Sequence, residues 1–274
     1  MSGPIQRVIV TLDAASENRT AIDTAVRLAV QTKAELHGVF IEDQDLLHLA
    51  GLPFAQQVTV ATGAEPLTSE GLELQLRAEA ERARNELFAA AKKHRVKCTF
   101  EILRGASEAA VTYASESDLV VTSGQSRPVA GHFRLERRWW SSIEAVSGPL
   151  LLARMAWTAA GPVVILLRDR DPASARLVET AAQIASARDE VLTVICPPAI
   201  ADSPGFDTWV SNSLAQHRVR VQIELAPAEP ATLHERLGQL DCRLLALEAG
   251  LAERSGETLR ELIGRVACDM LIVP

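Results

Sequence analysis

The stretch Arg7-Val8-Ile9-Val10-Thr11-Leu12-Asp13 is an apolar, β-branched run that closes on an acidic residue. The stretch Val163-Val164-Ile165-Leu166-Leu167-Arg168-Asp169 has the same pattern 156 positions later. The spacing holds beyond the strand, since segment 25–29 corresponds to 181–185 and segment 36–40 corresponds to 192–196. Three elements in register predict that a strand, helix, strand unit is duplicated in this chain.

The composition indicates a globular chain with room for two cores. Its 274 residues are 47% hydrophobic, which suits one large α/β domain or two domains of ordinary size. A net charge of −7 argues against non-specific binding to nucleic acid. No apolar run approaches the roughly 20 residues that cross a bilayer, so we expect no membrane span. Four dispersed cysteines and an N-terminus without a signal-like pattern predict a reduced, cytoplasmic protein.

Apolar runs alternate with amphipathic segments along both copies, which predicts parallel sheets covered by helices on both faces. In the first copy we expect strands at 7–12, 35–41, 97–103, 119–122 and 149–154, and helices at 17–31, from about 69 past 87, at 106–116 and at 134–146. In the second copy we expect strands from 163 and at 191–196, 219–225, 243–247 and 270–273, and helices from 171 and at 209–217, 232–240 and 257–266. The expected domains are residues 1–155, with an inserted loop at about 42–69, and a shortened domain at 161–274.

Four segments, taken in order, resemble the universal stress protein family in its tandem, two-domain form. They are the strand ending in Asp13, the passage 36–43, the segment 118–121 and the closing pattern 266–274. The resemblance covers nearly the whole chain and implies two flavodoxin-like, doubly wound α/β domains, each with a five-stranded parallel sheet. It also implies that the last strands of the two domains pair, which here sets 150–154 against 270–273 within one chain. A single chain then forms the functional pair, and a homodimer of chains is the alternative.

The stretch after Asp118 is the expected ligand site, because an open α/β sheet keeps its ligand where a strand leads into a helix. ATP-binding members of the family carry Gly, two residues, Gly, nine residues and then Gly-Ser or Gly-Thr. Ser123 and Ser126 take the places of the first two glycines here, while Glu136 and Arg137 take those of Gly-Ser. Phosphate binding by backbone amides needs residues that let the backbone approach closely. The resemblance therefore implies a degenerate nucleotide site.

A shifted alignment and the second copy give no better match to this motif. Gly131 with Ser141-Ser142 keeps the nine-residue spacing but needs Pro128 at the first glycine. In the second copy Gly250 and Gly256 lie too close together for a loop that wraps a triphosphate. We expect the second domain to be a structural partner.

Asp13 and Val39 occupy positions that meet the adenosine part of the ligand in the family, and Asp169 and Ile195 are expected as their counterparts. The alternative for Asp13 is a carboxylate that caps the first helix or ends a strand in a turn. The alternative for Val39 is ordinary sheet core.

The basic and aromatic run 134–140 offers a second way to hold an anion, through guanidinium groups such as that of Arg137 and a stacking indole. The alternative is a solvated helix face with tryptophans packed at an interface. Ser123 and Ser126 have no nearby histidine or lysine in the sequence that would activate them, so catalysis is unsupported. His37 is expected in the core, and the cysteines lack metal-ligand spacing.

The cluster 46–54, rich in leucine and ending in Phe54, has no equivalent in the second copy. It is expected either to lid a pocket or present a partner surface, or to fold over the sheet as extra core. Together these features predict a non-catalytic stress-response protein that works as a small-ligand or protein-interaction module. The alternative is a protein that binds ATP or another adenine nucleotide through the first domain, with slow hydrolysis.

Overall fold

The computed structural model describes residues 5–14, 18–59, 63–105, 114–123, 147–154, 161–186, 190–226, 235–237, 239–250, 266 and 268–274. The first half contains β1 (Arg7–Asp13), α1 (Asn18–Thr32), β2 (Glu35–Asp43), α2 (Gln44–Ala50), β3 (Gln56–Thr59), β4 (Gly63–Pro66), α3 (Ser69–His94), β5 (Cys98–Gly105), β6 (Asp118–Ser123) and β7 (Leu150–Ala153). The second half contains β8 (Val163–Leu166), α6 (Pro172–Ser186), β9 (Val191–Cys196), α7 (Pro198–Ala201), α8 (Phe206–Ser213), β10 (Arg220–Leu225), β11 (Leu244–Glu248) and β12 (Asp269–Val273).

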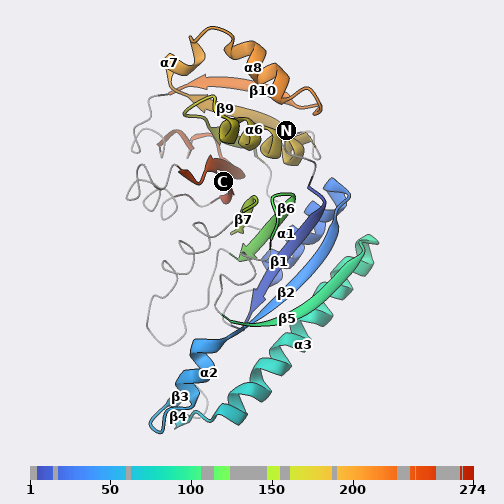
Figure 1. Ribbon diagram of the computed structural model, residues 1–274, viewed down its shortest axis with the longest axis vertical. Coiled ribbons are helices and arrows are strands. Elements are labelled where there is room, and N and C mark those ends of the chain that lie inside the picture. The colour runs from blue at the N-terminus through green and yellow to red at the C-terminus, as the bar shows by residue number, and fades with distance from the viewer. Residues whose placement is uncertain are drawn as a thin grey trace.

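A single ten-stranded sheet runs through the molecule in the order β10-β9-β8-β11-β12-β7-β6-β1-β2-β5 (Figure 1). Within each half the strands are parallel, and each half has its five strands in the same order, 3-2-1-4-5. The halves meet where β7 pairs antiparallel with β12, centred on Leu151 opposite Leu271. The expected pair of doubly wound domains and their pairing through the last strands are therefore confirmed.

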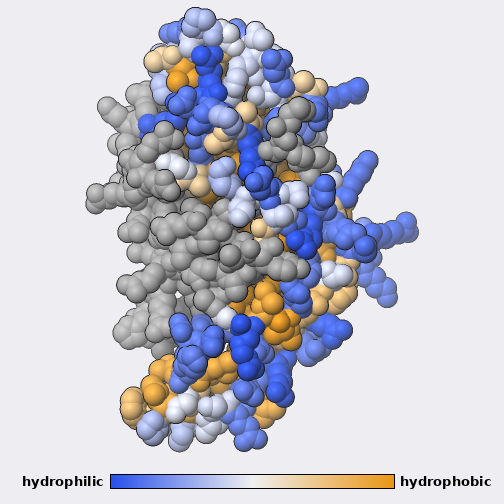
Figure 2. Space-filling model, viewed as in Figure 1, coloured by the Kyte–Doolittle hydropathy of each residue, from blue (hydrophilic) through white to orange (hydrophobic). Residues whose placement is uncertain are grey.

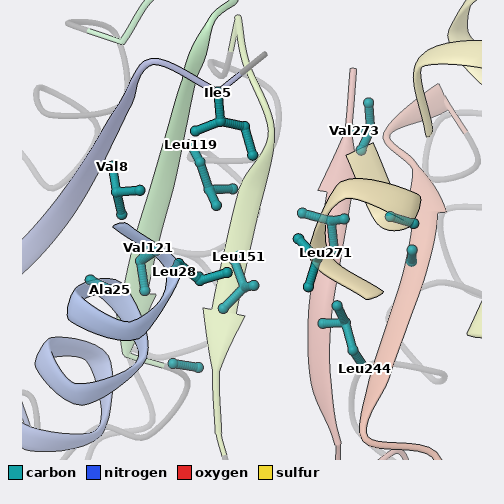
Figure 3. Close-up of a cluster of buried hydrophobic side chains, with 14 of the residues drawn as sticks. Ile5, Val8, Ala25, Leu28, Leu119, Val121, Leu151, Leu244, Leu271 and Val273 are labelled. Atoms are coloured by element: carbon teal, nitrogen blue, oxygen red, sulfur yellow. The ribbon is translucent and has the colours of Figure 1, made fainter. Parts of the chain in front are cut away.

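The core continues across this junction without a break. One face of the sheet is covered by α1 and α3 in the first half and by α6 in the second, and all three helices contribute to the same buried cluster. Figure 3 shows Leu151 and Leu271 from the two halves side by side in that cluster. A second buried cluster lies on the opposite face and likewise contains residues of both halves. Removing either half would expose apolar surface on both faces, which explains why the two halves stay together.

The offset of 156 positions between the two copies holds for only some of their elements. α1 and α6 keep that offset, since Ala25 and Ala181 are both fully buried on the same helix face. In the sheet, Val8 pairs with Leu36 whereas Val163 pairs with Leu192, so strands β1 and β8 are related by 155 positions. The sequence alignment of these two strands is therefore wrong by one residue.

This one-residue difference changes which residues are equivalent at the carboxyl ends of β1 and β8. Leu12 corresponds to Leu167, and both are buried in the helix-covered cluster. Arg168, not Asp169, thus corresponds to Asp13. A one-residue shift moves every side chain of a strand to the other face of the sheet. Burial therefore fixes the register, which a run of similar apolar residues in the sequence cannot do.

The halves differ most between their second and third strands. The passage 42–69, expected as a loop, contains α2 and the β3–β4 hairpin, and these elements project with the start of α3 as an arm (residues 44–76) from the end of the sheet (Figure 1). Thr68 caps α3 by accepting a hydrogen bond from the amide of Gly71, as its position suggested. The second half has only α7 and α8 at this point, and α8 starts three residues before the expected 209. The helices expected at 106–116, 134–146 and 257–266 lie largely or wholly outside the described residues.

Candidate functional site

The carboxyl ends of β1 and β6 define the candidate site in the first half. The chain leaves β1 toward β2 on one side, and β6 lies on the other, so the strand order reverses between them. Ligands of open α/β sheets bind in the crevice at such a point. β1 and β6 are in register from Arg7 opposite Asp118, and continuing that register brings Leu12 level with Ser123. Asp13 and Ser123 thus end neighbouring strands at one edge of the sheet.

Asn18 holds the backbone of Asp13 at the end of β1. The amide of Asp13 donates to Oδ1 of Asn18 at 3.3 Å, and Nδ2 of Asn18 donates back to the carbonyl oxygen of Asp13 at 2.9 Å. Asn18 is the first residue of α1, so these two bonds fix the turn between strand and helix. The side chain of Asp13 is half-buried, while Ser123 is buried at 8% exposure.

Of the other expected ligand residues the structure describes Val39, which lies on β2 opposite Thr11 of β1. Val39 is fully buried in the cluster on the sheet face opposite α1, where it packs as core. Ser126 and Arg137 lie outside the described residues, as does the rest of the run 134–140. The adenosine role of Val39 and the anion role of Arg137 stay predictions.

The corresponding point of the second half is occupied by a carboxylate. β8 pairs with β11 from Val163 opposite Leu244, which places Glu248 where the first half has Ser123. Glu248 is 4% exposed, and its Oε1 accepts a hydrogen bond from Oγ of Ser174 at 2.5 Å. Ser174 lies in the first turn of α6, where its amide donates to Oδ1 of the capping Asp171 at 2.8 Å.

This arrangement determines what the second half can accept. The N-terminus of a helix attracts negative charge, and here Glu248 and Asp171 of the chain itself already supply it. A phosphate entering beside them would meet two carboxylates. The sequence indicated a short loop in the second half but gave no role to Glu248, because its partner Ser174 is 74 positions away.

Asp118, at the opposite end of β6, belongs to a structural ion pair. Arg7 donates from Nε to Oδ1 at 3.1 Å and from Nη2 to Oδ2 at 2.7 Å, and the amide and Oγ of Ser115 both donate to Oδ2 at 2.8 Å. Burial alone would raise the pKa of Asp118, but the hydrogen bonds from Arg7 and Ser115 and the charge of Arg7 hold it below its ordinary value of 3.8. This pair fixes the start of the strand whose far end forms the candidate site.

His37, expected in the core, is buried but also takes part in a polar group on β2 and β5. Its Nδ1 lies 2.7 Å from Oγ1 of Thr99 and its Nε2 lies 3.1 Å from Oε1 of Glu101. Both partners stand on the edge strand of the first half.

The arm has both buried and exposed apolar side chains. Ala50, Leu72 and Leu76 form a small buried cluster, against which Leu46 and Leu47 pack. Other apolar side chains of the arm face solvent, with exposed fractions of 46% for Leu49, 42% for Leu52, 77% for Phe54 and 60% for Leu74. Figure 2 shows hydrophobic surface gathered at this end of the molecule.

Ala14 joins the base of the arm to the candidate site. It follows Asp13 directly and packs against both the large helix-side core and the small cluster of the arm. The arm is therefore rooted beside the carboxyl end of β1.

Several solved structures share this architecture. A universal stress protein from Archaeoglobus fulgidus DSM 4304 superposes with a TM-score of 0.69 over 98% of this chain and 97% of its own, at 10% sequence identity. The chain has the fold of a tandem universal stress protein. A protein from Pseudomonas aeruginosa UCBPP-PA14, provisionally assigned to the same family, gives 0.62 at 14% identity, with 98% and 93% of the two chains covered. A protein of unknown function from Pseudomonas aeruginosa PAO1 gives 0.60 at 14% identity, with 98% and 92% covered.

The resemblance to universal stress proteins noted from the sequence is thus confirmed at the level of the fold. No protein-family model matches the sequence, and no curated protein matches it either. Because the identities are so low, the universal stress fold is carried here by the strand order and the paired last strands rather than by shared motifs.

Other described surfaces have fewer features of a ligand site than the carboxyl ends of β1 and β6. A shallow hollow of about 330 Å³, lined by residues that include Gly161, Glu190 and Gln222, lies at the amino ends of β8 to β10, the edge opposite the ligand end. Within the described ranges, no three His, Cys, Asp or Glu residues are grouped as metal ligands. Nor is any described helix long and apolar enough to cross a membrane.

Proposed function

We propose that the chain is a non-catalytic, cytoplasmic binding protein of stress adaptation, which docks a protein partner on its arm. The observation that carries this proposal is the exposure of Phe54, 77%, beside the partly exposed Leu49 and Leu52. Single exposed apolar residues are common, but several on one projecting element are typical of interaction surfaces. Aromatic side chains are also enriched at the centres of such interfaces.

The construction of the arm supports docking rather than a role in the core. Its buried cluster of Ala50, Leu72 and Leu76 already fixes α2 against α3, so the exposed side chains are not needed to hold the arm together. The charged side chains that the structure describes along the arm are acidic: Asp45 and Glu70 are exposed, and Glu73 is partly exposed and lies 3.7 Å from Arg77. A partner with an apolar patch and basic residues at its rim would match this surface.

The second half supports a degenerate nucleotide site. Glu248 and Asp171 supply negative charge at the point that corresponds to the candidate site of the first half, which disfavours a phosphate there. This half therefore fits the structural role expected of it.

The test is capture of a partner by the full chain under native conditions, followed by cross-linking and mass spectrometry. The variants are Phe54→Ser on the arm and Val30→Ser as a matched control, because Val30 is an apolar residue of α1 exposed at 44%. A partner should cross-link to the wild type and to Val30→Ser and be lost, by about tenfold or more, with Phe54→Ser. Identical protein sets for all three chains would exclude the arm as the docking surface.

A second candidate function is binding of ATP or another adenine nucleotide by the first half. It is favoured by the small Ser123 and the half-buried Asp13 at the point where strand order reverses, since the corresponding point of the second half holds Glu248. The measurement is calorimetric titration of ATP into the wild type and Asp13→Ala, together with mass spectrometry of ligand retained by the native protein. Micromolar binding that Asp13→Ala abolishes would establish this function. The absence of both retained ligand and measurable titration would leave the interaction module.

A further inference from the structure

Two cysteines that are 26 positions apart in the sequence lie in contact at the amino ends of neighbouring strands. Cys242 stands two residues before β11 and Cys268 stands directly before β12, and these strands pair from Leu244 opposite Asp269. The two sulfur atoms are 3.6 Å apart and share a hydrogen bond. Both thiols are free, Cys268 being buried and Cys242 partly exposed.

The two sulfur atoms are thus in van der Waals contact, and a small movement would bring them to bonding distance. A disulfide has its sulfurs about 2 Å apart, so closure requires a movement of about 1.5 Å. The partly exposed Cys242 gives small reagents an approach to the pair, while Cys268 packs in the core cluster of the sheet face opposite α6.

The charges around the pair suit thiol chemistry. The Nη1 atom of Arg154 donates to the carbonyl oxygen of Val266, two residues before Cys268, at 2.6 Å. The hydrogen bond with Cys268 and burial raise the pKa of the Cys242 thiol, although the charge of Arg243 opposes this. The guanidinium groups of Arg154 and Arg243 thus lie near the pair. Cysteines react as thiolates, which nearby guanidinium groups stabilise.

We propose that Cys242 and Cys268 form an oxidisable dithiol, which reduces a hydroperoxide and closes to a disulfide between the starts of β11 and β12. In the first step a thiolate attacks the O–O bond, which gives a sulfenic acid and releases hydroxide. In the second step the other thiol attacks that sulfur, so that the S–S bond forms, the S–O bond breaks and the oxygen leaves as water. With hydrogen peroxide, two thiols are oxidised, one peroxide is reduced to two waters, and the thiol protons end on those waters.

The position of the pair gives its oxidation a structural consequence. β12 is the strand through which the second half pairs with the first, and Arg154 ties the two by donating its amide to Oδ1 of Asp269 at 2.6 Å. A disulfide would join β12 covalently to β11 beside this junction. It would constrain the unfolded chain, so the oxidised protein should unfold at a higher denaturant concentration than the reduced one.

The test compares full-length chains treated with one equivalent of hydrogen peroxide, denatured, alkylated and mapped by mass spectrometry. The wild type should lose the mass of two hydrogen atoms and leave only Cys98 and Cys196 alkylated. The double variant Cys98→Ser/Cys196→Ser keeps the pair and should take up no alkyl group after oxidation. Alkylation of all four cysteines in the oxidised wild type would overturn the proposal, and this measurement needs no variant of the buried site.

Single variants separate the pair from an ordinary exposed thiol. Cys242→Ser should stop disulfide formation and leave Cys268 as a sulfenic acid that dimedone traps, at a rate about tenfold or more above that of Cys98. Equal labelling of Cys98 and Cys268 would contradict the assignment. A parallel arm with glutathione disulfide distinguishes the oxidant, because an internal disulfide formed equally fast in that arm would show thiol–disulfide exchange, rather than reaction with peroxide, and would overturn the hydroperoxide assignment.

Discussion

The two halves of the sheet share strand order, pairing and core, yet the same register positions carry opposite chemistry. At the carboxyl end the first half has Asp13 and Ser123, and the second has Arg168 and Glu248. At the amino end Asp118 of β6 corresponds to Arg243, which precedes β11. The duplicated fold thus fixes where side chains stand, while the residues placed there decide which half offers a site.

The largest expected effect tests the amino-end ion pairs. Arg243 donates from Nε and Nη2 to Oε2 of Glu190 at 3.1 and 2.5 Å, and its side chain is 1% exposed, against 30% for that of Arg7. Arg243→Ala removes a buried cation beside the carboxylate of Glu190, whose side chain is 12% exposed, and should lower the free energy of unfolding by about 3–5 kcal/mol. Arg7→Ala should cost about 1–3 kcal/mol, because the Asp118 carboxylate that remains keeps its hydrogen bonds from the amide and Oγ of Ser115. Urea unfolding of both variants measures the difference, and equal losses would contradict it.

The arm, which the second half lacks, can be divided by a pair of substitutions. Leu76 is 2% exposed in the arm's own cluster, so Leu76→Ala should cost about 2–5 kcal/mol. Phe54→Ser should change stability by about 0.5 kcal/mol or less, since its ring faces solvent. Thermal and urea unfolding would measure both, and a large loss in Phe54→Ser would show that the ring is core.

The pH dependence of stability should show the contribution of the ionised Asp118 carboxylate in the first half. Its folded pKa lies below 3.8, so its ionised form stabilises the fold above that pH, and the stabilisation is lost as the pH falls through 3.8 and then through the folded pKa. Asp118→Asn should remove about 1–3 kcal/mol near neutral pH and flatten this acid-side loss. Urea unfolding between pH 7 and 3 measures both curves. Parallel curves for the two proteins would show that another group causes the loss.

The smallest expected effect is that of giving the end of β6 the residue type found at the end of β11. Ser123→Glu gives the first half the carboxylate of the second, so any affinity for ATP should fall by about tenfold or more, equivalent to about 1.4 kcal/mol. Ser123→Ala keeps the small side chain and is the matched control. Titration calorimetry would compare the three proteins, and unchanged ATP binding in Ser123→Glu would place the nucleotide elsewhere.

Much of the fold followed from local patterns in the sequence. The apolar runs at β1, β2, β9 and β12 predicted their strands within one or two residues, and the buried stripe of α3 and its cap at Thr68 were legible from spacing. These features depend on neighbours within a few positions, so a local pattern suffices to predict them. The resemblance to tandem universal stress proteins added the pairing of the last strands.

The candidate site could be predicted only in part. The resemblance to universal stress proteins marked Asp13 and Ser123, but the alignment of the two copies paired Asp13 with Asp169 rather than Arg168. It also found the cysteines dispersed, although Cys242 and Cys268 each stand just before a strand and those strands are adjacent.

What the sequence determined by itself is the duplicated α/β unit, because apolar periodicity and turn residues specify strands and helices locally. Only the tertiary structure decided the strand register, the contact of Ser174 with Glu248, the contact of the two thiols and the exposure of Phe54. These depend on which distant segments become neighbours when the sheet closes on its helices. The physical reason is that register is set by burying one face of a strand, and burial is a property of the folded chain.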